Sequence, residues 1–297
     1  MREHFGTLCV ALAGLLALSH AQAGELCVKN ADASLLCLKQ PAQRVISLAP
    51  HLSEMMFAVD AGEQLVGVVS HSDYPPAAKA LPDIGSYHQP DLEKLLALQP
   101  DLVLGWQSGT SPALRDKLTQ LGLKLWVGRG EQLSDIAAEL RAIGALTGHA
   151  HTGEQAAQRF EHELESLAAA HRDARPLRGF YQVWPQPLVT VSDGHFISEA
   201  MRICAVSNIV GQAQSSAPTW SVEAVVRARP EIIFTSAPAR DFENWQRWSD
   251  MPAVKNHALI VLPADVLMRP APRVIEGVRA LCTAADRHRQ AASSAAE

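Results

Sequence analysis

Apolar positions along the first half of the chain follow two alternating spacings. Short runs of consecutive apolar residues predict buried strands at residues 44–48, 65–69, 102–104 and 123–127. Between these runs, apolar residues at helical spacing predict helices at residues 53–58, 92–99, 112 onward and 133–147. Ser53 is expected to cap the first helix, and Gly148 to end the last. This alternation predicts an α/β lobe with a mainly parallel sheet.

The same alternation returns in the second half of the chain. Strands are predicted at residues 178–184, 188–191, 232–234 and 259–261. Helices are predicted at residues 197–204, after Ser221, at 242–248 and at 273–287. A second α/β lobe follows from this pattern.

One long segment separates the two halves. Residues 151–173 contain no proline and only an early glycine, and Ala157, Phe160, Leu164 and Leu167 share one helical face. A helix of this length is about 35 Å long and forms a rigid strut rather than a flexible linker. A long surface helix within a single domain is the alternative.

We therefore predict an α/β fold class in which two α/β lobes with mainly parallel sheets are joined by one long backbone helix. The expected parts are a signal peptide (1–23), an N-terminal lobe with an N-terminal hairpin (24–148), the linking backbone helix (149–175), a C-terminal lobe (176–290) and a flexible tail (291–297). The tail is assigned because its residues are mostly Ala and Ser.

An internal repeat supports two related lobes. Residues 91–105 and 221–235 both run from a capping Asp or Ser, through a Glu, to a proline and an apolar strand. The Glu-to-Pro spacing is seven residues in both copies (100 − 93 and 230 − 223). Glu93 and Glu223 therefore occupy equivalent places, and such a matched pair of acids suits a two-fold symmetric partner. The alternative is that both are solvated helix charges favoured by the helix dipole.

The N-terminus indicates export. Arg2, an apolar run at residues 8–18 and the small-residue motif ending at Ala23 predict a secretory signal peptide cleaved after Ala23. The apolar run is too short to anchor the protein stably in a membrane. Leu26, before Cys27, is not the small residue expected before a lipid-modified cysteine, so a lipoprotein is the weaker alternative.

Four cysteines remain after Cys9 leaves with the signal peptide, and four cysteines allow three pairings. Cys27 and Cys37 flank a polar turn, and a hairpin there would bring them opposite each other. This leaves Cys204 with Cys282, both on apolar faces of predicted helices. Buried free thiols are the alternative, although an exported protein favours disulfides.

Composition and motifs narrow the function. The net charge of −5 and the absence of a basic stripe argue against nucleic acid as a partner. The sequence has no P-loop, dinucleotide fingerprint or G-x-S-x-G motif, so we predict no enzyme and no cofactor. His51, His71 and His88 fall in predicted loops of the first lobe. Neutral imidazoles there could ligate a metal ion, or the cobalt or iron of a ligand, but their spacing matches no metal motif.

Several motifs carry a family resemblance over about residues 42–285. They are Arg44-Val-Ile-Ser-Leu-Ala-Pro50, Ser72-Asp-Tyr-Pro-Pro76, Leu92-Glu93 with Pro100-Asp-Leu-Val, and Val222-Glu223 with Pro230. With them the chain resembles the substrate-binding proteins of ABC importers that are built on a single helical backbone. The resemblance implies a monomeric periplasmic protein that performs no chemistry and delivers a ligand held between its lobes to a two-fold symmetric permease.

Within that family, three features favour a corrinoid, cobalamin, as the ligand. They are the Ser72–Pro76 loop, the pair Cys204 and Cys282, and the series Asp265, Arg269 and Arg273. Ferric-siderophore and haem binders share the other motifs and are the alternatives. His71 stands where the cobalamin binder has a tyrosine, and Ala217 lies near where it has a tryptophan, so the exact ligand stays open.

The resemblance and the loop positions together imply a set of site residues. Tyr87 and Trp106 match aromatic contacts of relatives, and Asp265 and Arg269 match polar contacts to the corrin. The full predicted ligand-binding set is His71, Tyr74, Tyr87, His88, Trp106, Trp184, Asp265 and Arg269. Glu93 and Glu223 resemble the family's docking acids, which meet permease arginines. Trp126, Trp245 and Trp248 are expected to be structural, whereas Trp220 either compensates for Ala217 in the site or belongs to the core.

Overall fold

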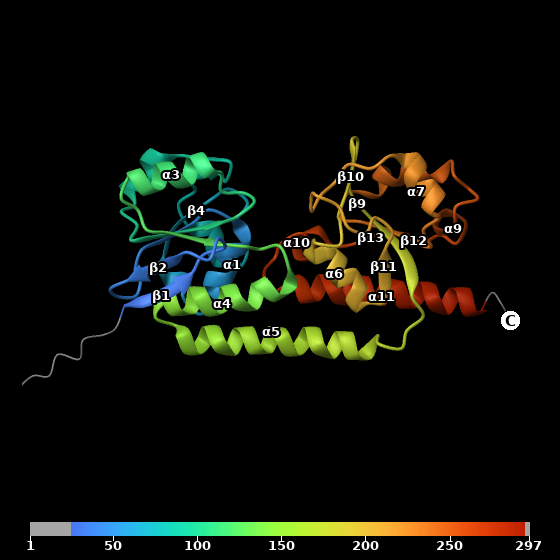
Figure 1. The fold of residues 1–297 in the computed structure, drawn as a ribbon. Helices are drawn as coiled ribbons and strands as arrows, with labels where there is room; N and C mark the ends of the chain where they lie inside the picture. The colour runs from blue at the N-terminus through green and yellow to red at the C-terminus, as the bar shows by residue number, and fades with distance from the viewer. Residues whose placement is uncertain (1–24, 295–297) are drawn as a thin grey trace, which may run out of the picture.

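The computed structural model describes residues 25–294. The predicted signal peptide, its cleavage site after Ala23 and Cys9 lie outside the described residues, as do residues 295–297. Two lobes stand side by side above a pair of long helices (Figure 1). None of the helices between residues 25 and 294 is long and apolar enough to cross a membrane.

The N-terminal lobe is built on a parallel sheet of strand order β4-β3-β7-β8. Its strands are β3 (Val45–Ser47), β4 (Leu65–Val68), β7 (Leu102–Trp106) and β8 (Leu125–Gly128). Its helices are α1 (Pro50–Ala58), α2 (Leu92–Ala97), α3 (Pro112–Gln120) and α4 (Leu133–Thr147). Two small hairpins, β1 (Leu26–Lys29) with β2 (Leu35–Leu38) and β5 (Gly85–Ser86) with β6 (Gln89–Pro90), and short 3-10 helices at Gly62–Gln64 and Pro76–Ala80 complete it.

The C-terminal lobe has a sheet of order β10-β9-β12-β13, with β11 also paired to β9. Only the β10–β9 pair among these strands is antiparallel. Its strands are β9 (Leu177–Pro185), β10 (Leu188–Thr190), β11 (Val206–Asn208), β12 (Ile232–Thr235) and β13 (Leu259–Val261). Its helices are α6 (Phe196–Ile203), α7 (Val222–Ala228), α8 (Glu243–Gln246), α9 (Pro252–Lys255), α10 (Ala264–Leu267) and α11 (Val274–Ser294), with a 3-10 helix at Ala239–Phe242. The predicted fold class of two α/β lobes is confirmed.

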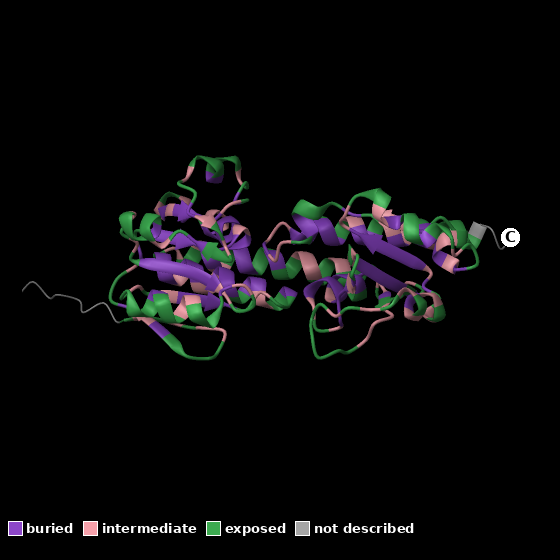
Figure 2. Ribbon diagram, turned by 90° about the horizontal axis from the view of Figure 1, so that it is seen from above, coloured by how far each residue is buried: buried purple, intermediate pink, exposed green. Residues whose placement is uncertain are grey.

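Helix α5 (Ala150–Ala170) runs beneath both lobes, and α11 lies beside it under the C-terminal lobe (Figure 1). Helix α5 has 21 residues and is therefore about 32 Å long. The buried strands of both lobes face a core that also contains residues of α1, α4, α5, α6 and α11 (Figure 2). One apolar cluster continues from lobe to lobe and includes residues of α5. Helix α5 is therefore a packed structural element and not a free linker.

Two glycines let α4 and α5 approach closely at the start of the long helix. A Cβ at Gly153 would lie 2.7 Å from the carbonyl oxygen of Leu140 and 3.1 Å from the Cα of Gly144. A Cβ at Gly144 would likewise lie 2.9 Å from the Cα of Gly153. Backbone contact between the helices therefore explains the glycine near the start of the long helix.

The sequence repeat corresponds to a repeated structural unit. In each lobe a short helix, α2 or α7, precedes a central strand, β7 or β12. The Asp91 carboxylate accepts hydrogen bonds from the N–H groups of Glu93 and Lys94, and the Ser221 hydroxyl accepts one from Ala224. Both predicted N-caps are confirmed, and they place Glu93 and Glu223 in the first turn of equivalent helices.

The repeat extends to residues outside the two repeated segments. Arg44 donates from Nη2 to the carbonyl oxygen of Leu98, and Arg178 donates from Nη2 to that of Ala228, each two residues before the repeat proline. The acid that follows the proline accepts a hydrogen bond from the main-chain N–H of the same arginine. Asp101 accepts from Arg44, and Glu231 accepts from Arg178. The lobes therefore use the same interactions to hold the repeat helix against the neighbouring strand.

Several helix boundaries differ from the prediction; among them, the backbone helix predicted at 149–175 ends at Ala170, and the helix predicted at 242–248 is limited to Glu243–Gln246. Helix α1 begins at Pro50 with Ala49 as its N-cap, so Ser53 lies inside the helix and His51 lies in its first turn instead of a loop. Proline favours this first helical position because it has no N–H to satisfy. Helix α11 extends to Ser294, four residues into the predicted flexible tail, because the Ala and Ser residues there continue a helix with little penalty.

The predicted cysteine pairing is confirmed. Cys27 and Cys37 face each other across the β1–β2 hairpin and form one disulfide. Cys204, at the C-terminal end of α6, is bonded to Cys282 in α11, 78 residues away. This second bond ties the C-terminal helix to the lobe it supports, and both of its cysteines are buried.

Candidate functional site

A cavity of about 350 Å³ lies where the two lobes meet. The N-terminal lobe contributes residues from the start of α1, the loop after β4, the β5–β6 connection and the end of β7, and the C-terminal lobe contributes the start of α6 and the segment after α10. The lining residues are Ala49, Pro50, His51, Ser70, His71, Tyr87, Trp106, Ser108, Gly130, His195, Phe196, Met268, Arg269 and Pro270. A pocket built by both lobes is where a ligand can contact both.

Aromatic rings form one wall of the cavity. Tyr87 lies in the tight β5–β6 connection, and Trp106 is the last residue of β7, with ring centroids 5.2 Å apart. His51 meets Trp106 edge to face at 5.4 Å, and the His88 ring lies tilted against that of Tyr87 with centroids 3.8 Å apart. These rings present broad apolar surface with few polar groups, as suits a large, flat and mostly uncharged ligand.

Two histidines of the cavity are held neutral. His51 is 6% exposed, and burial, with a smaller effect of the Arg269 charge, lowers its pKa to about 3. Burial also lowers the pKa of His195, the N-cap of α6, to about 4. Its Nδ1 accepts the N–H of Ile197 at 3.1 Å, so the ring proton lies on Nε2. Neither imidazole adds charge to the cavity at neutral pH.

A buried carboxylate joins the lobes beside the cavity. Glu54 in α1 has a side chain only 3% exposed, and it receives hydrogen bonds from two arginines of the C-terminal lobe. Arg273 donates from Nε and Nη2 at 2.9 and 2.8 Å, and Arg269 donates from Nη1 at 3.1 Å. Both Glu54 oxygens are therefore satisfied by groups of the other lobe.

The loop after β4 is part of the same network. Arg269 donates to the Asp73 carboxylate at 2.6 Å and to the main-chain carbonyl of His71 at 3.2 Å. The hydrogen bond from Arg269 lowers the pKa of Asp73. The Arg273 guanidinium lies over the ring of Tyr74, 3.5 Å from its centroid, as a cation–π contact. Arg269 lines the cavity, but most of its donors are used to connect the lobes.

The structure brings together half of the predicted ligand-binding set. His71, Tyr87, Trp106 and Arg269 line the cavity. Tyr74 lines a neighbouring pocket with Glu54 and Arg273, and His88 is exposed beside Tyr87. Trp184, in β9 and 58% exposed, and Asp265, exposed in the first turn of α10, do not line this cavity. Trp126 and Trp245 are buried in the lobe cores, as predicted.

Several functional candidates were not found from sequence. His195, Phe196 and Met268 line the cavity from the C-terminal lobe. The one available signal was their place after predicted strands, which many other residues share. Glu54 was also missed because a glutamate inside a predicted helix is typical of a solvated surface.

The predicted docking acids lie on exposed helix starts. Glu93 and Glu223 are both exposed, in the first turns of α2 and α7. Helix α7 stands on the side of the C-terminal lobe opposite α5 (Figure 1). Both acids are therefore accessible to a partner.

A second buried acid supports the cavity from behind. Glu139 in α4 accepts the N–H of Gly130, a cavity residue, at 2.9 Å, while its other carboxylate oxygen has no hydrogen-bond partner. Burial raises the pKa of Glu139 to about 8. The residue also lines a separate pocket of about 610 Å³ between β1–β2, β8 and α4. Because of its raised pKa, the Glu139 carboxyl is mainly protonated and uncharged at neutral pH.

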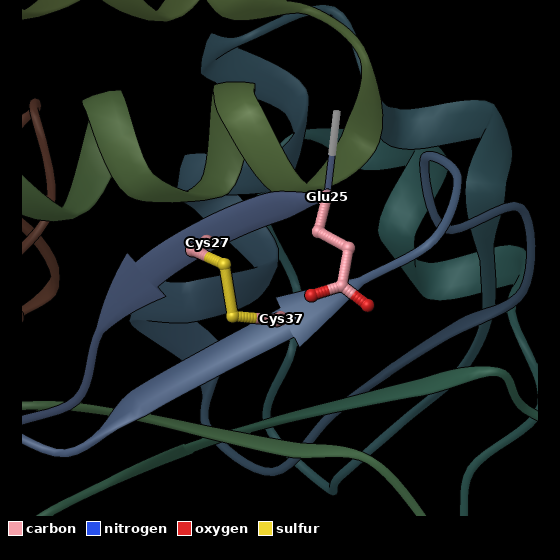
Figure 3. A group of neighbouring side chains, drawn as sticks. All are labelled: Glu25, Cys27 and Cys37. Atoms are coloured by element: carbon pink, nitrogen blue, oxygen red, sulfur yellow. A yellow bond between two sulfur atoms is a disulfide. The ribbon is translucent and has the colours of Figure 1, made fainter. Parts of the chain in front are cut away.

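One group of potential metal ligands occurs among the described residues, at Glu25, Cys27 and Cys37 (Figure 3). The two sulfur atoms are bonded to each other, so neither supplies the thiolate that a metal ion requires. This cluster is therefore a disulfide beside an exposed carboxylate.

The family model for periplasmic binding proteins matches residues 45–266, more than half of the chain. The chain belongs to the periplasmic binding protein family. This is a family of binding proteins, in agreement with the absence of catalytic motifs in the sequence.

Individual relatives and solved structures agree with that family. The vitamin B12-binding protein of Vibrio cholerae is 36% identical over 245 residues, covering 82% of this chain and 89% of that protein. The crystal structure of the periplasmic vitamin B12 binding protein BtuF of Vibrio cholerae superposes with a TM-score of 0.77 at 34% identity, covering 84% of this chain and 98% of that one. The periplasmic heme-binding protein RhuT from Roseiflexus sp. RS-1, with a TM-score of 0.74 at 22% identity and coverage of 83% and 99%, shares the fold.

Replacing Glu54 by glutamine should destabilise the protein strongly. Removing one partner from a buried ion pair leaves buried charge uncompensated and costs about 3 kcal/mol of unfolding free energy. Urea unfolding of E54Q measures this loss. The matched control is E163Q, whose partner Arg279 is half exposed and whose loss should cost less than about 1 kcal/mol. Equal, small effects of both substitutions would contradict a structural role for the Glu54 network.

Glu139 should make stability fall as pH rises. Its folded-state pKa of about 8 lies above its ordinary value of 4.5, so between these values the folded state binds more protons than the unfolded chain. Relative to E139Q, the wild type should lose up to about 1.4 kcal/mol of unfolding free energy per pH unit in that window. Urea unfolding at several pH values measures it, with E131Q, an exposed neighbour, as control. Parallel curves for wild type and E139Q would refute the buried neutral carboxyl.

Proposed function

We propose that this protein captures a corrinoid, cobalamin, between its lobes and delivers it to an ABC permease of the inner membrane. The observation that carries the proposal is the cavity shared by both lobes, with its aromatic wall and its neutral histidines. The likeness to proteins named for vitamin B12 binding supports it. Haem delivery is the alternative, because a heme-binding protein shares this fold.

The chemistry of the cavity matches that ligand. A corrinoid is flat, largely apolar on its faces and bordered by amide groups, so it requires aromatic surface with a few donors at the edges. Tyr87 and Trp106 supply the surface, and the Nε2–H of His195 and the guanidinium of Arg269 supply donors. Because the cavity is smaller than a corrinoid, we take it as the floor of the site. Trp184, with 58% of its surface exposed on β9, is proposed to contact the part of the ligand above that floor.

The cellular setting follows from the same proposal. Cleavage after Ala23 would remove residues 1–23 and release the chain to the periplasm, where its two disulfides are stable. The protein would act there as a monomer, with the corrinoid as cargo and no cofactor. Glu93 and Glu223, exposed on equivalent helices of related lobes, would meet the two halves of a symmetric permease.

Calorimetric titration of the mature chain with cyanocobalamin tests the ligand. We expect one-to-one binding with a submicromolar Kd. Substitution of Trp106 by alanine should weaken binding at least about tenfold, because it removes an aromatic contact surface. W248A, outside the cavity, serves as control, with melting temperatures checking that both variants fold. Binding of haem or a ferric siderophore, but not of cobalamin, would retain the family and reject the corrinoid.

Charge reversal at both docking acids should abolish delivery without changing ligand affinity. E93R/E223R places positive charge where permease arginines are expected, so docking is lost by repulsion. Ligand uptake into proteoliposomes that contain the cognate importer measures delivery, and calorimetry measures affinity. E165R/D173R makes the same change of net charge at one exposed position within α5 and one beyond its end, and it should transport normally. Weakened ligand affinity in E93R/E223R would rule out a pure docking role.

A further inference from the structure

The cavity between the lobes contains five side chains that are able in principle to coordinate a metal. They are His51, His71, Tyr87, His195 and Met268. Neutral imidazole is a good ligand for the cobalt or iron at the centre of a macrocycle, and a thioether or a phenolate can also serve. The contacts of each side chain decide whether it has a free lone pair to offer a metal.

Four of the five are unsuited to the role. The Nδ1 of His195 is occupied by the N–H of Ile197, so its Nε2 carries the proton and has no free lone pair. His51 is buried against Trp106, and its Nε2 is not exposed. The Sδ of Met268 lies 3.2 Å from the Tyr181 hydroxyl, which also contacts the Ser236 hydroxyl at 2.7 Å, so the sulfur already has a polar neighbour. Tyr87 would first have to lose its phenolic proton, which a neutral imidazole does not require.

His71 has none of these obstacles. It is exposed at the cavity, and its imidazole makes no hydrogen bond or ion pair with the residues that the structure describes. Its main chain, in contrast, is held at its carbonyl and at the residue that follows. The carbonyl accepts a hydrogen bond from Arg269, the N–H of Ser72 bonds to Val69, and the buried Ser72 hydroxyl bonds to Ser53. The φ of 68° at His71 turns the chain at this point. A free imidazole on a fixed backbone is a preorganised ligand.

We propose that His71 coordinates the cobalt of the bound corrinoid, and that the protein therefore prefers corrinoids with an exchangeable axial ligand. This inference rests on the function proposed above. In the step, the bond from Co(III) to an axial water breaks and a bond from cobalt to an imidazole nitrogen forms. The water leaves, and the oxidation state and total charge stay the same. Aquocobalamin carries such a water, whereas the cyanide of cyanocobalamin exchanges poorly.

The visible absorption spectrum of the corrinoid tests this proposal. Wild-type protein should shift the spectrum of bound aquocobalamin, because the axial oxygen is replaced by nitrogen. H71A should bind aquocobalamin about tenfold more weakly and without the shift, while its affinity for cyanocobalamin changes less. Free imidazole added to the H71A complex should restore the shift. The matched control is H257A, since His257 is also exposed with a positive φ of 54° and lies outside the cavity.

Three results would overturn the proposal. A shift that persists in H71A assigns the ligand to another group. An unshifted wild-type spectrum, with cyanocobalamin binding intact by calorimetry, shows that cobalt is not coordinated, and it leaves the proposed function standing. Absence of binding for every corrinoid rejects the proposed function together with the inference.

Discussion

The arrangement of the two lobes depends on one buried carboxylate. Glu54 extends from the first helix of the N-terminal lobe and receives three hydrogen bonds from Arg269 and Arg273 of the C-terminal lobe. Buried charges are tolerated out of water only when each is satisfied, so the contacts among these three groups favour the arrangement of the lobes seen here. The long helix α5 sets the distance between the lobes, and the Glu54 network sets how they face each other.

The same network shapes the candidate site. Arg269 holds the loop after β4 through Asp73 and the carbonyl of His71, and it lines the cavity itself. The site is therefore assembled by contacts between lobes and not by either lobe alone. Because α5 is one continuous helix packed against a core that spans both lobes, ligand entry is expected to involve small adjustments of loops and not a wide hinge motion.

Membership of the periplasmic binding protein family places the cavity in a functional context, since the vitamin B12-binding relative covers most of the chain. The ligand is decided by the cavity chemistry, because corrinoid and haem binders share this fold. Neutral His51 and His195 add no charge to the cavity, and under the proposal above His71 would make binding depend on the metal at the centre of the ligand.

The sequence by itself determined most of the longer strands and helices, the repeat and both helix caps at Asp91 and Ser221, because these depend on spacing and on contacts a few residues apart. The start of α1 was missed, although Pro50 marks it locally. Only the tertiary structure decided which side chains meet. Arg269 reaches Glu54 across 215 residues, and His195 enters the cavity from the second lobe. Burial then set the protonation of His51 and Glu139, since the loss of water depends on packing from every side and on no local pattern.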